Sequence, residues 1–388
     1  MTALPEPDQH SVIQSSKAAA AIREKIDQAG GSLEFAAYMH EALYAPGLGY
    51  YTGSARKFGS DGDFVTAPEI SDVFGYCIAR QVAPVIATAG GNVMEFGAGR
   101  GTLAVSVLER LESLGALPDE YLIVEVSPDL AVRQQALIAK RLPELASRVR
   151  WIDELPDRFR GVMLANEVLD AIPFSRFVIR DGRPRILRVT HNASGFAYCE
   201  DDPSTEQASA IADIETDIHR SLAEGYTSEL GLAAAAWTQD IIQRLETGLL
   251  LMFDYGVDRR AYYADERQDG WLRCHFRHHA HNDALILPGI QDITAWVDFS
   301  AVADAAVSAG ASVAGYVTQA HFLMAAGLDE ELATLADAPV EGQLRVAAGI
   351  RTLTLPGEMG EHIKAIGFIR GDVHAPTALT LMDRTGVL

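Results

Sequence analysis

The sequence is poor in cysteine and in long apolar runs. Its three cysteines, Cys77, Cys199 and Cys274, lie far apart without paired spacing, which argues against a disulfide framework and favours a reducing compartment. It contains no run of about 18 apolar residues, so a membrane-spanning helix is not expected. Residues 1–10 have neither a basic start nor an apolar stretch, so we expect no secretory signal and a cytoplasmic location.

Positive charge is also scarce. The chain has 32 basic against 53 acidic residues, which gives a formal net charge of −21 at pH 7. Such a field repels nucleic acid and anionic lipid and attracts basic partners. We therefore expect no nucleic-acid binding and no membrane insertion, and a partner attracted by this field is expected to be basic. An acidic surface can also serve solubility alone. The oligomeric state stays open, with a homodimer among the alternatives.

A glycine-rich loop follows the apolar strand residues Val93 and Met94. Glu95 precedes the loop, and Gly97, Gly99 and Gly101 alternate within it. Glycine lets a ligand touch the backbone, and the amphipathic helix that follows turns its amide-rich N-terminus toward the loop. The arrangement predicts a nucleotide-binding site.

The loop does not fit a dinucleotide. The NAD fingerprint places its third glycine three positions after the second, where this chain has Thr102. The carboxylate of Glu95 would repel a pyrophosphate, whereas it would attract the sulfonium and ammonium of S-adenosylmethionine. An acid followed by three alternate glycines is the pattern that S-adenosylmethionine-dependent methyltransferases use. S-adenosyl-L-methionine is therefore the predicted cofactor, and a nicotinamide-dependent oxidoreductase is a distant alternative.

Strand and helix patterns alternate around this loop, which predicts an α/β, Rossmann-like fold. We expect a seven-strand methyltransferase sheet with an antiparallel last strand, from strands near residues 93–94, 121–126, 149–152, 161–165, 248–253, 311–318 and 364–370. Helices are expected at residues 11–29, 128–142 and 297–309, and Ser32 can cap another. Residues 45–74, dense in Gly, Pro, Asp and Ser, predict a long irregular segment.

About seventy residues between the fourth and fifth strands exceed what a crossover needs, and they predict an α+β insertion. Residues 176–200 alternate as a hairpin around Asp181 and Gly182, and residues 205–222 have helical character. We divide the chain into an N-terminal helical and cofactor-covering segment (1–80), the first half of the core (81–175), an inserted substrate or cap subdomain (176–247), and the second half of the core (248–388) with an active-site loop (265–295).

Carboxylates follow two of the expected strands. Glu125 ends the second strand, where a carboxylate can accept two hydrogen bonds from a ribose diol. Asp153, just past the third strand, could accept from the adenine amino group, although capping a helix before Leu155 is an equal alternative. Glu95, if buried, needs donors such as loop amides or a ligand ammonium.

The segment after the fourth strand carries the candidate catalytic residues, Asn166, Glu167 and Asp170. Methyl transfer is an in-line displacement, so the protein mainly positions a nucleophile. A guanidinium has a pKa above about 12, so its nitrogen attacks only when carboxylates hold it. Glu167 and Asp170 could form such a clamp, whereas the alternative is a helix cap and a solvated acid.

An Arg/His cluster occupies residues 273–281, with four histidines and Cys274. No second ligand cluster accompanies it and its arginines would repel a cation, so we expect no metal. We interpret it as a loop near the active-site mouth, or as an interaction surface between the insertion and the core.

Together the motifs resemble those of the MidA family, which contains bacterial proteins and a mitochondrial complex I assembly factor. They span nearly the whole chain, at residues 62–71, 95–102, 124–128, 166–173, 253–256, 291–294 and 297–299. Two departures are Ala98, where many members have proline, and Val168-Leu169, where two phenylalanines are common. The first should matter little, and the second could reshape the acceptor pocket.

The resemblance implies a class I methyltransferase with extra N-terminal and inserted segments. It implies a protein arginine N-methyltransferase-like activity, with a complex I subunit as one possible partner. A non-catalytic S-adenosylmethionine-binding assembly factor and a small-molecule methyltransferase are the alternatives. The resemblance implies that Glu95, Gly97, Gly99, Gly101 and Glu125 are donor-site residues and that Thr66, Pro68 and Glu69 form part of a wall around the donor. From their positions after the strands, we add Val126, Asp153 and Asn166 to the predicted cofactor-binding residues.

Overall fold

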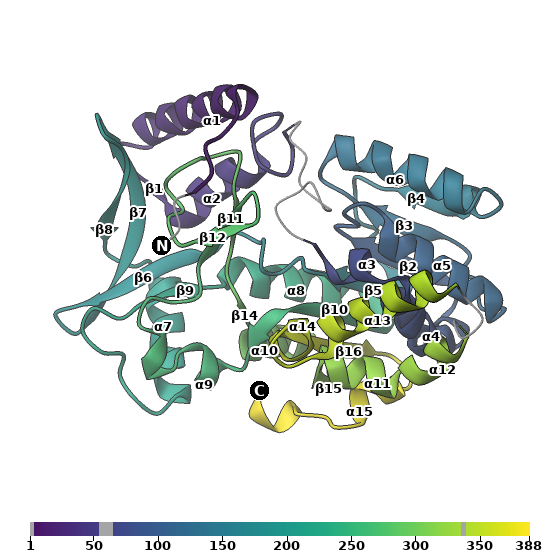
Figure 1. Cartoon of the computed structure of the whole chain (residues 1–388). Helices are drawn as coiled ribbons and strands as arrows, with labels where there is room; N and C mark the ends of the chain where they lie inside the picture. The colour runs from purple at the N-terminus through teal and green to yellow at the C-terminus, as the bar shows by residue number, and fades with distance from the viewer. Residues whose placement is uncertain (1–3, 54–64, 335–338) are drawn as a thin grey trace. The chain divides into compact units, whose positions relative to one another are not determined.

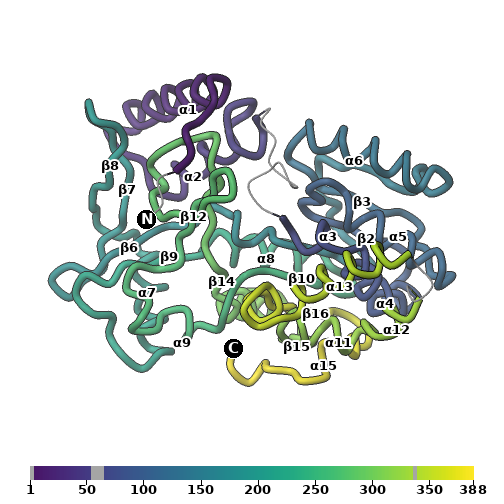
Figure 2. The backbone as a smooth tube through the Cα atoms, viewed as in Figure 1, coloured from purple at the N-terminus to yellow at the C-terminus, as the bar shows by residue number. Residues whose placement is uncertain are grey.

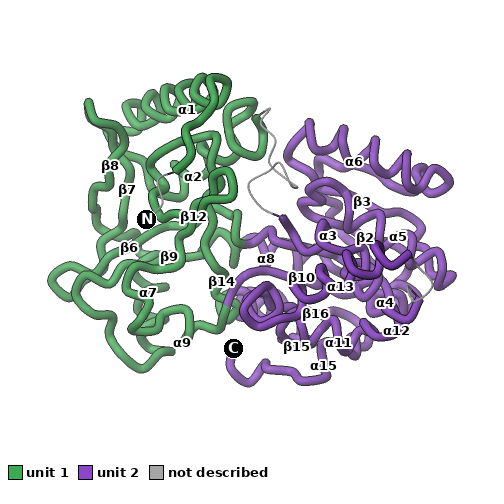
Figure 3. The backbone as a smooth tube through the Cα atoms, viewed as in Figure 1, with its two compact units in different colours: residues 1–64, 170–236, 257–301 green, residues 65–169, 237–256, 302–388 purple. Residues whose placement is uncertain are grey.

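The computed structural model describes residues 4–53, 65–334 and 339–388, and its backbone is traced in Figure 2. The chain forms two compact units, shown in Figure 3. Unit 1 comprises residues 1–64, 170–236 and 257–301, and unit 2 comprises residues 65–169, 237–256 and 302–388. The chain passes from one unit to the other after residues 64 and 169, and again within α8 (Leu232–Arg244), β10 (Leu245–Val257) and α10 (Phe299–Ser308).

A large twisted sheet forms the centre of unit 2 (Figure 1). Seven strands follow one another in the order β15-β16-β10-β5-β2-β3-β4. β10, β5, β2, β3 and β4 are parallel, whereas β16 runs antiparallel to both β10 and β15. Besides β10, the strands are β2 (Asn92–Phe96), β3 (Tyr121–Val124), β4 (Val149–Trp151), β5 (Phe159–Asn166), β15 (Ser312–Thr318) and β16 (Ile363–Arg370). The expected sheet with an antiparallel last strand is confirmed.

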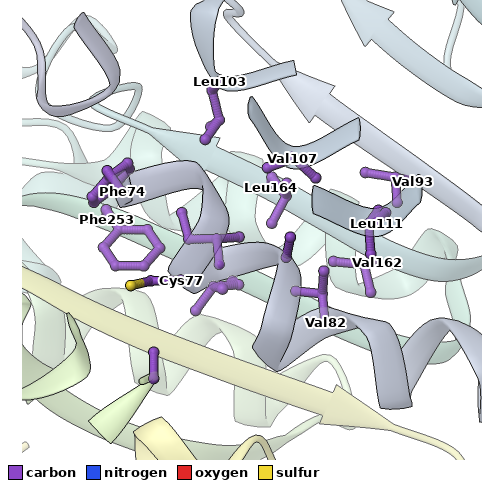
Figure 4. Packing of buried hydrophobic residues seen from close by; sticks show 14 of the residues in the cluster. Phe74, Cys77, Val82, Val93, Leu103, Val107, Leu111, Val162, Leu164 and Phe253 are labelled. Atoms are coloured by element: carbon purple, nitrogen blue, oxygen red, sulfur yellow. The ribbon is translucent and has the colours of Figure 1, made fainter. Parts of the chain in front are cut away.

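Apolar side chains alternate along the parallel strands and so supply both faces of this sheet. Val93, Val162, Leu164 and Phe253 pack with side chains of α4 (Asp72–Ala89) and α5 (Thr102–Ser113), as Figure 4 shows. α4 and α5 approach closely, since a Cβ on Gly75 would lie 1.9 Å from Ser106 Oγ. Phe96 points to the other face, where its ring meets Trp237 of α8 edge-on at 5.0 Å. Both faces are covered, as expected for strands with nearly continuous apolar sequence.

The remaining helical elements of unit 2 lie before, between and after the strands in sequence. They are α3 (Ala67–Ile70), α6 (Pro128–Arg141), η1 (Ala146–Arg148), α11 (Gln319–Ala325), α12 (Leu328–Ala333), α13 (Val340–Thr354), α14 (Met359–His362), α15 (Thr377–Thr380) and η3 (Thr385–Val387). A buried charge cluster fixes α12, because Glu331 accepts hydrogen bonds from Arg80 of α4 at 3.3 Å and from Arg110 of α5 at 2.6 Å. α13 packs against α3, where a Cβ on Gly349 would lie 3.0 Å from the Ile70 carbonyl oxygen.

Unit 1 contains two smaller sheets. The five-stranded one has the order β1-β7-β6-β9, with β8 also paired to β7, and the three-stranded one has the order β12-β11-β13. The strands of these two sheets are β1 (Leu33–Glu34), β6 (Ser175–Arg180), β7 (Arg183–Asn192), β8 (Gly195–Asp201), β9 (Thr227–Leu230), β11 (Arg273–Phe276), β12 (His279–His281) and β13 (Asp292–Thr294). Unit 1 also includes β14 (Val297–Asp298), which belongs to neither of them. The helical elements are α1 (Gln9–Gln28), α2 (Phe35–Tyr44), α7 (Thr205–Asp217), α9 (Arg259–Tyr262) and η2 (Asp265–Arg267).

Residues 176–236 of the α+β insertion lie in unit 1, and they match their expected local structure. Asp181 and Gly182 both have positive φ, 50° and 68°, as the two central residues of a tight hairpin turn require. α7 begins with a capping box, in which Ser204 and Gln207 satisfy each other's backbone amides. Side chains of the insertion pack with those of α1 and α2 in one aromatic and aliphatic core. The four-segment division of the chain into functional parts stays a prediction.

Two local expectations are wrong, and a third, the irregular segment of residues 45–74, holds for residues 45–53 but not for its C-terminal end. Ser32 does not cap α2, whose N-cap is Glu34, because Ser32 Oγ instead accepts a hydrogen bond from Arg188 Nε at 2.9 Å. Within residues 45–74, α3 and the start of α4 are helical, and Ser71 caps α4 by accepting from Val73 N. The Arg/His cluster is a β-hairpin of β11 and β12 and not a loop, with Arg277 and His278 at positive φ in its turn.

Candidate functional site

The glycine loop in unit 2 has the backbone that its sequence predicts. Gly97, Gly99 and Gly101 have φ values of 63°, 54° and 86°, a region that residues with a side chain adopt only at a cost. Gly97 N donates to the Val124 carbonyl oxygen at 2.9 Å, and Gly101 N donates to that of Ala98 at 2.7 Å. The loop is therefore fixed to the carboxyl end of β3 and turns back on itself before α5 begins at Thr102.

The loop offers a ligand close access to backbone. A Cβ built at Gly99 would meet no described atom within 4 Å outside its chain neighbours, whereas one at Gly97 would lie 3.3 Å from Val168 Cγ2. The N-terminal amides of α5 follow directly, and a helix N-terminus favours negative or electron-rich groups. The middle of the loop is thus the open part of the cradle.

Glu95 is fully buried at the end of β2, with 2% of its surface exposed. Its Oε2 accepts a hydrogen bond from the Tyr121 hydroxyl at 2.6 Å. Burial raises the pKa of Glu95 to about 7, the Tyr121 hydrogen bond opposes this, and the charge of Glu125 adds to it. The hydrogen-bond donor to the buried Glu95 is therefore Tyr121 on the neighbouring strand, which was not predicted from the sequence.

Glu125 follows β3, one residue after the strand ends at Val124. Its Oε1 accepts from Ser127 N at 2.9 Å, and its Oε2 accepts from Gln134 Nε2 at 2.8 Å. Val126 beside it is 63% exposed. Asp153 is exposed after β4, and the structure has no helix at Leu155 for it to cap, so that alternative is wrong.

Asn166 ends β5, and Glu167 directly after it has the left-handed φ of 52°. Such a conformation in a residue with a long side chain costs on the order of 1 kcal/mol and occurs often at functional sites. Glu167 Oε1 accepts from Ala67 N and from Asn166 Nδ2, both at 3.2 Å. Burial raises the pKa of Glu167 to about 8, and the nearby Asp254 and Glu69 charges contribute. The second atom of the Asn166 amide, Oδ1, is buried without a hydrogen-bond partner among the described residues.

Asp254 holds this segment in place, a role that sequence reasoning did not assign. The residue is 1% exposed on β10, next to β5 in the sheet. Its Oδ2 accepts from the backbone amides of Val168 and Leu169 at 3.1 and 2.8 Å. Its Oδ1 accepts from Tyr255 N at 2.8 Å. The chain after Glu167 is therefore anchored to the neighbouring strand by charge-assisted hydrogen bonds.

The motif at residues 62–71 is described only from Val65 onward, so residues 62–64 lie outside the described residues. Thr66 precedes α3 and accepts from Glu69 N at 3.0 Å through its carbonyl oxygen, and Pro68 is buried within the helix. Glu69 Oε1 lies 3.7 Å from Nε of Arg100 in the glycine loop. α3 therefore makes two contacts: Glu69 lies near the glycine loop, and the Ala67 amide donates to Glu167.

Asp170 belongs to unit 1, whereas Glu167 belongs to unit 2. The Asp170 carbonyl oxygen accepts from Ala295 N at 3.2 Å. The pKa of the Tyr51 hydroxyl is well above its ordinary value, mainly because of burial and the charge of Asp292. The Asp170 carboxylate makes a smaller contribution in the same direction. The expected clamp of Glu167 and Asp170 stays a prediction.

The Arg/His hairpin lies in unit 1 and is tied to the N-terminal segment, since Arg277 forms an ion pair with Asp8. Burial lowers the pKa of His275 to about 4. Among the described residues, no group of three or more His, Cys, Asp or Glu side chains could hold a metal ion. Across the same residues, helices of the length and apolarity needed to cross a bilayer are absent.

The strand order, the glycine loop, and the acids at the ends of β2 and β3 define the class as an S-adenosylmethionine-dependent methyltransferase. A family model described as "Putative S-adenosyl-L-methionine-dependent methyltransferase" matches residues 77–317. The chain belongs to this family, which confirms the resemblance drawn from the motifs. It is a methyltransferase, and S-adenosyl-L-methionine is its methyl donor.

Curated relatives match most of the chain. The mitochondrial protein arginine methyltransferase NDUFAF7 homolog of Drosophila melanogaster is 29% identical to this chain, and the match covers 94% of this chain and 89% of the relative's chain. The mitochondrial protein arginine methyltransferase NDUFAF7 of Mus musculus is 30% identical, over 85% and 79%. These relatives are named as mitochondrial proteins, so the expected cytoplasmic location is wrong. Unpaired cysteines argue against an oxidising compartment but do not separate one reducing compartment from another.

A crystal structure from Burkholderia thailandensis, bound to S-adenosyl-homocysteine, matches with a TM-score of 0.94. It is 40% identical to this chain and covers all of both chains. A native crystal structure of a protein from the same organism matches at 40% identity with a TM-score of 0.91. The α/β methyltransferase fold is thereby shown.

Proposed function

We propose that the chain transfers a methyl group to an arginine nitrogen of a protein substrate. The observation that carries the proposal is the buried carboxyl group of Glu167, held at a left-handed φ just after β5. Support also comes from relatives named protein arginine methyltransferases, which match over 85% or more of this chain.

A guanidinium suits this carboxyl group chemically. The pKa of a guanidinium exceeds about 12, so the attacking nitrogen must lose a proton as its bond to carbon forms. A pKa of about 8 leaves the isolated Glu167 carboxyl largely protonated near neutrality, and a bound cation favours its ionised form. The ionised carboxylate can then orient the guanidinium and accept the departing proton. In our proposal Asp170 completes the clamp, and the free Asn166 Oδ1 accepts a second N–H.

The donor site fits the chemistry of S-adenosylmethionine. In our assignment the glycine loop of Gly97, Gly99 and Gly101, which is open at Gly99, would hold the methionine part, with Glu95 near its ammonium. The carboxylate of Glu125 would hold the ribose diol, the exposed Val126 would contact the adenine, and Asp153 would accept a hydrogen bond from the adenine amino group. α3, with Thr66, Pro68 and Glu69, covers this site. Bound S-adenosylmethionine supplies an electrophilic methyl group, and its sulfur keeps the electron pair of the broken bond.

The charge of −21 supports a basic, arginine-bearing protein as the partner. We assign substrate recognition to residues 176–247 and 265–295, and cofactor covering to residues 1–80. A subunit of respiratory complex I is the first candidate substrate, because the MidA family includes a complex I assembly factor.

The test is methyl transfer from labelled S-adenosylmethionine to arginine-bearing proteins, with the modified residue located by mass spectrometry. We expect methyl-arginine with the wild type and a loss of at least about a hundredfold in kcat with Glu167→Gln, which keeps the side-chain shape but cannot accept the departing proton. Glu246→Gln is the matched control, because Glu246 is an exposed glutamate on β10 in the same unit.

Labelling of a small molecule or of another side chain would contradict the proposal. Full complex I assembly with a Glu167→Gln variant that binds the donor but transfers no methyl group would instead favour the non-catalytic assembly role. Equal activity of Glu167→Gln and Glu246→Gln would remove Glu167 from the reaction.

A further inference from the structure

Gln134 on α6 is fully buried, with 0% of its surface exposed, and it joins three parts of the donor site. Its Nε2 donates to the Gly99 carbonyl oxygen and to Glu125 Oε2, both at 2.8 Å. Its Oε1 accepts from the Trp151 indole nitrogen at 2.7 Å. One side chain therefore connects the glycine loop, the acid after β3, and β4.

The hydrogen-bonding capacity of this amide matches its surroundings. An uncharged glutamine side chain has two N–H donors and an acceptor oxygen, and all three kinds of contact are made. The orientation of the amide follows from its neighbours, because only the NH₂ group can serve a carbonyl and a carboxylate. A glutamate at this position could not donate, and its charge would face that of Glu125 at hydrogen-bonding distance.

The contact with Gln134 also explains why the third glycine of the loop is Gly101, one position earlier than in the NAD fingerprint. A Cβ on Gly101 would lie 3.3 Å from Gln134 Cγ and 3.4 Å from Gln134 Cα, a contact that would force α6 or the loop to move. Gly101 also has a φ of 86°. The spacing that excludes the NAD pattern thus lets α6 approach closely enough for Gln134 to reach Gly99 and Glu125.

We infer that Gln134 is a positioning residue for the methyl donor, acting through Glu125 and the Gly99 carbonyl. Glu125 Oε1 is fixed by Ser127 N and Oε2 by Gln134, so the carboxylate has one orientation before any ligand arrives. The side chain thereby pre-organises the group that we assign to the ribose diol, and pre-organisation raises affinity by reducing the ordering cost of binding. The inference rests on the donor-site part of the proposed function and is independent of the acceptor.

The experiment measures S-adenosylhomocysteine binding to the full chain by calorimetry, for the wild type and Gln134→Met. Methionine keeps the volume and loses all three hydrogen bonds. We expect affinity to fall about tenfold to hundredfold, the range for a hydrogen bond to a charged group. The matched control is Gln319→Met, because Gln319 is another fully buried glutamine of unit 2, bonded to the Leu353 carbonyl oxygen instead of the donor site. It should lose stability but bind the ligand normally.

A double-mutant cycle separates positioning from general destabilisation. If Gln134 acts through Glu125, the combined Gln134→Met and Glu125→Gln variant should bind clearly better than the product of the two single losses predicts. Additive losses, or normal binding by Gln134→Met, would overturn the inference. If Glu125→Gln itself binds normally, the donor-site assignment fails with it, whereas arginine methylation is tested separately with Glu167→Gln.

Discussion

Replacing Glu95 by glutamine should stabilise the ligand-free protein at alkaline pH while it weakens donor binding. The glutamine amide could still accept the hydrogen bond that the Tyr121 hydroxyl donates to Glu95 at 2.6 Å. The substitution removes only the possibility of a negative charge in a site shielded from solvent, since Glu95 is 2% exposed. Because burial raises the pKa of Glu95 to about 7, its ionised form is a cost to the fold.

The direction of the pH dependence follows from proton binding. An unfolded chain releases the proton near the ordinary pKa of 4.5, whereas the folded chain keeps it until about 7. Between these values the native state binds more protons, so stability falls as pH rises and stops changing once the folded group has ionised. At about 1.4 kcal/mol per pH unit, the interval corresponds to a penalty of about 3 kcal/mol.

The assay is urea unfolding at about pH 5 and about pH 8 for the wild type and Glu95→Gln. The stability advantage of the variant should grow by about 2–3 kcal/mol between the two conditions. Glu331→Gln is the matched control, because Glu331 is equally buried in the same unit but paired with Arg80 and Arg110. It should lose stability at about pH 8. An advantage for Glu95→Gln that does not change with pH would refute the reasoning.

Three further substitutions probe other parts of the structure. Gly101→Ala should cost about 1–2 kcal/mol in thermal unfolding and weaken S-adenosylhomocysteine binding, because it strains a φ of 86° and crowds Gln134. Asp254→Asn should lower kcat about tenfold with an unchanged donor Kd, because it weakens the anchor of the backbone after Glu167 and leaves the glycine loop intact. Glu229→Ala should cost about 3–5 kcal/mol in urea unfolding, because the buried Arg176 of unit 1 loses its carboxylate partner at 3.1 Å.

The sheet of unit 2 could be predicted because local sequence specifies its strands. Runs such as β10 are apolar on both faces, and βαβ units place successive strands in parallel. The glycine loop could also be predicted, because its positive φ values favour glycine and the alternate glycines are visible in the sequence. α4 was missed because it begins within a segment rich in Gly, Pro, Asp and Ser, where composition suggested irregular structure.

The polar contacts of the donor site could not be predicted in this way. Gln134 lies on an amphipathic helix where a polar residue normally faces solvent, and its burial depends on a close approach to Gly101. Tyr121 reads as one more apolar strand residue until β3 is placed beside β2. Asp254 sits after a long apolar run, and only the sheet order brings it to the backbone that follows β5. Each contact joins residues distant in sequence, and periodicity carries no information on such pairs.

The two acids of the donor site, Glu125 and Glu95, lie in different environments and therefore suit different roles in ligand binding. Glu125 is partly exposed, and amide donors from Ser127 and Gln134 hold its carboxylate, an arrangement that suits a permanent acceptor for hydroxyl groups. Glu95 is buried on β2 beside Tyr121, and its pKa is raised to about 7. Whether its carboxyl group is ionised near neutral pH therefore depends on the charge of a neighbouring group. A ligand ammonium would favour its ionised form and recover the cost that folding imposes. Calorimetry in buffers of different ionisation enthalpy should therefore detect a net release of protons when the wild type binds the donor near pH 7, and Glu95→Gln should lose that release.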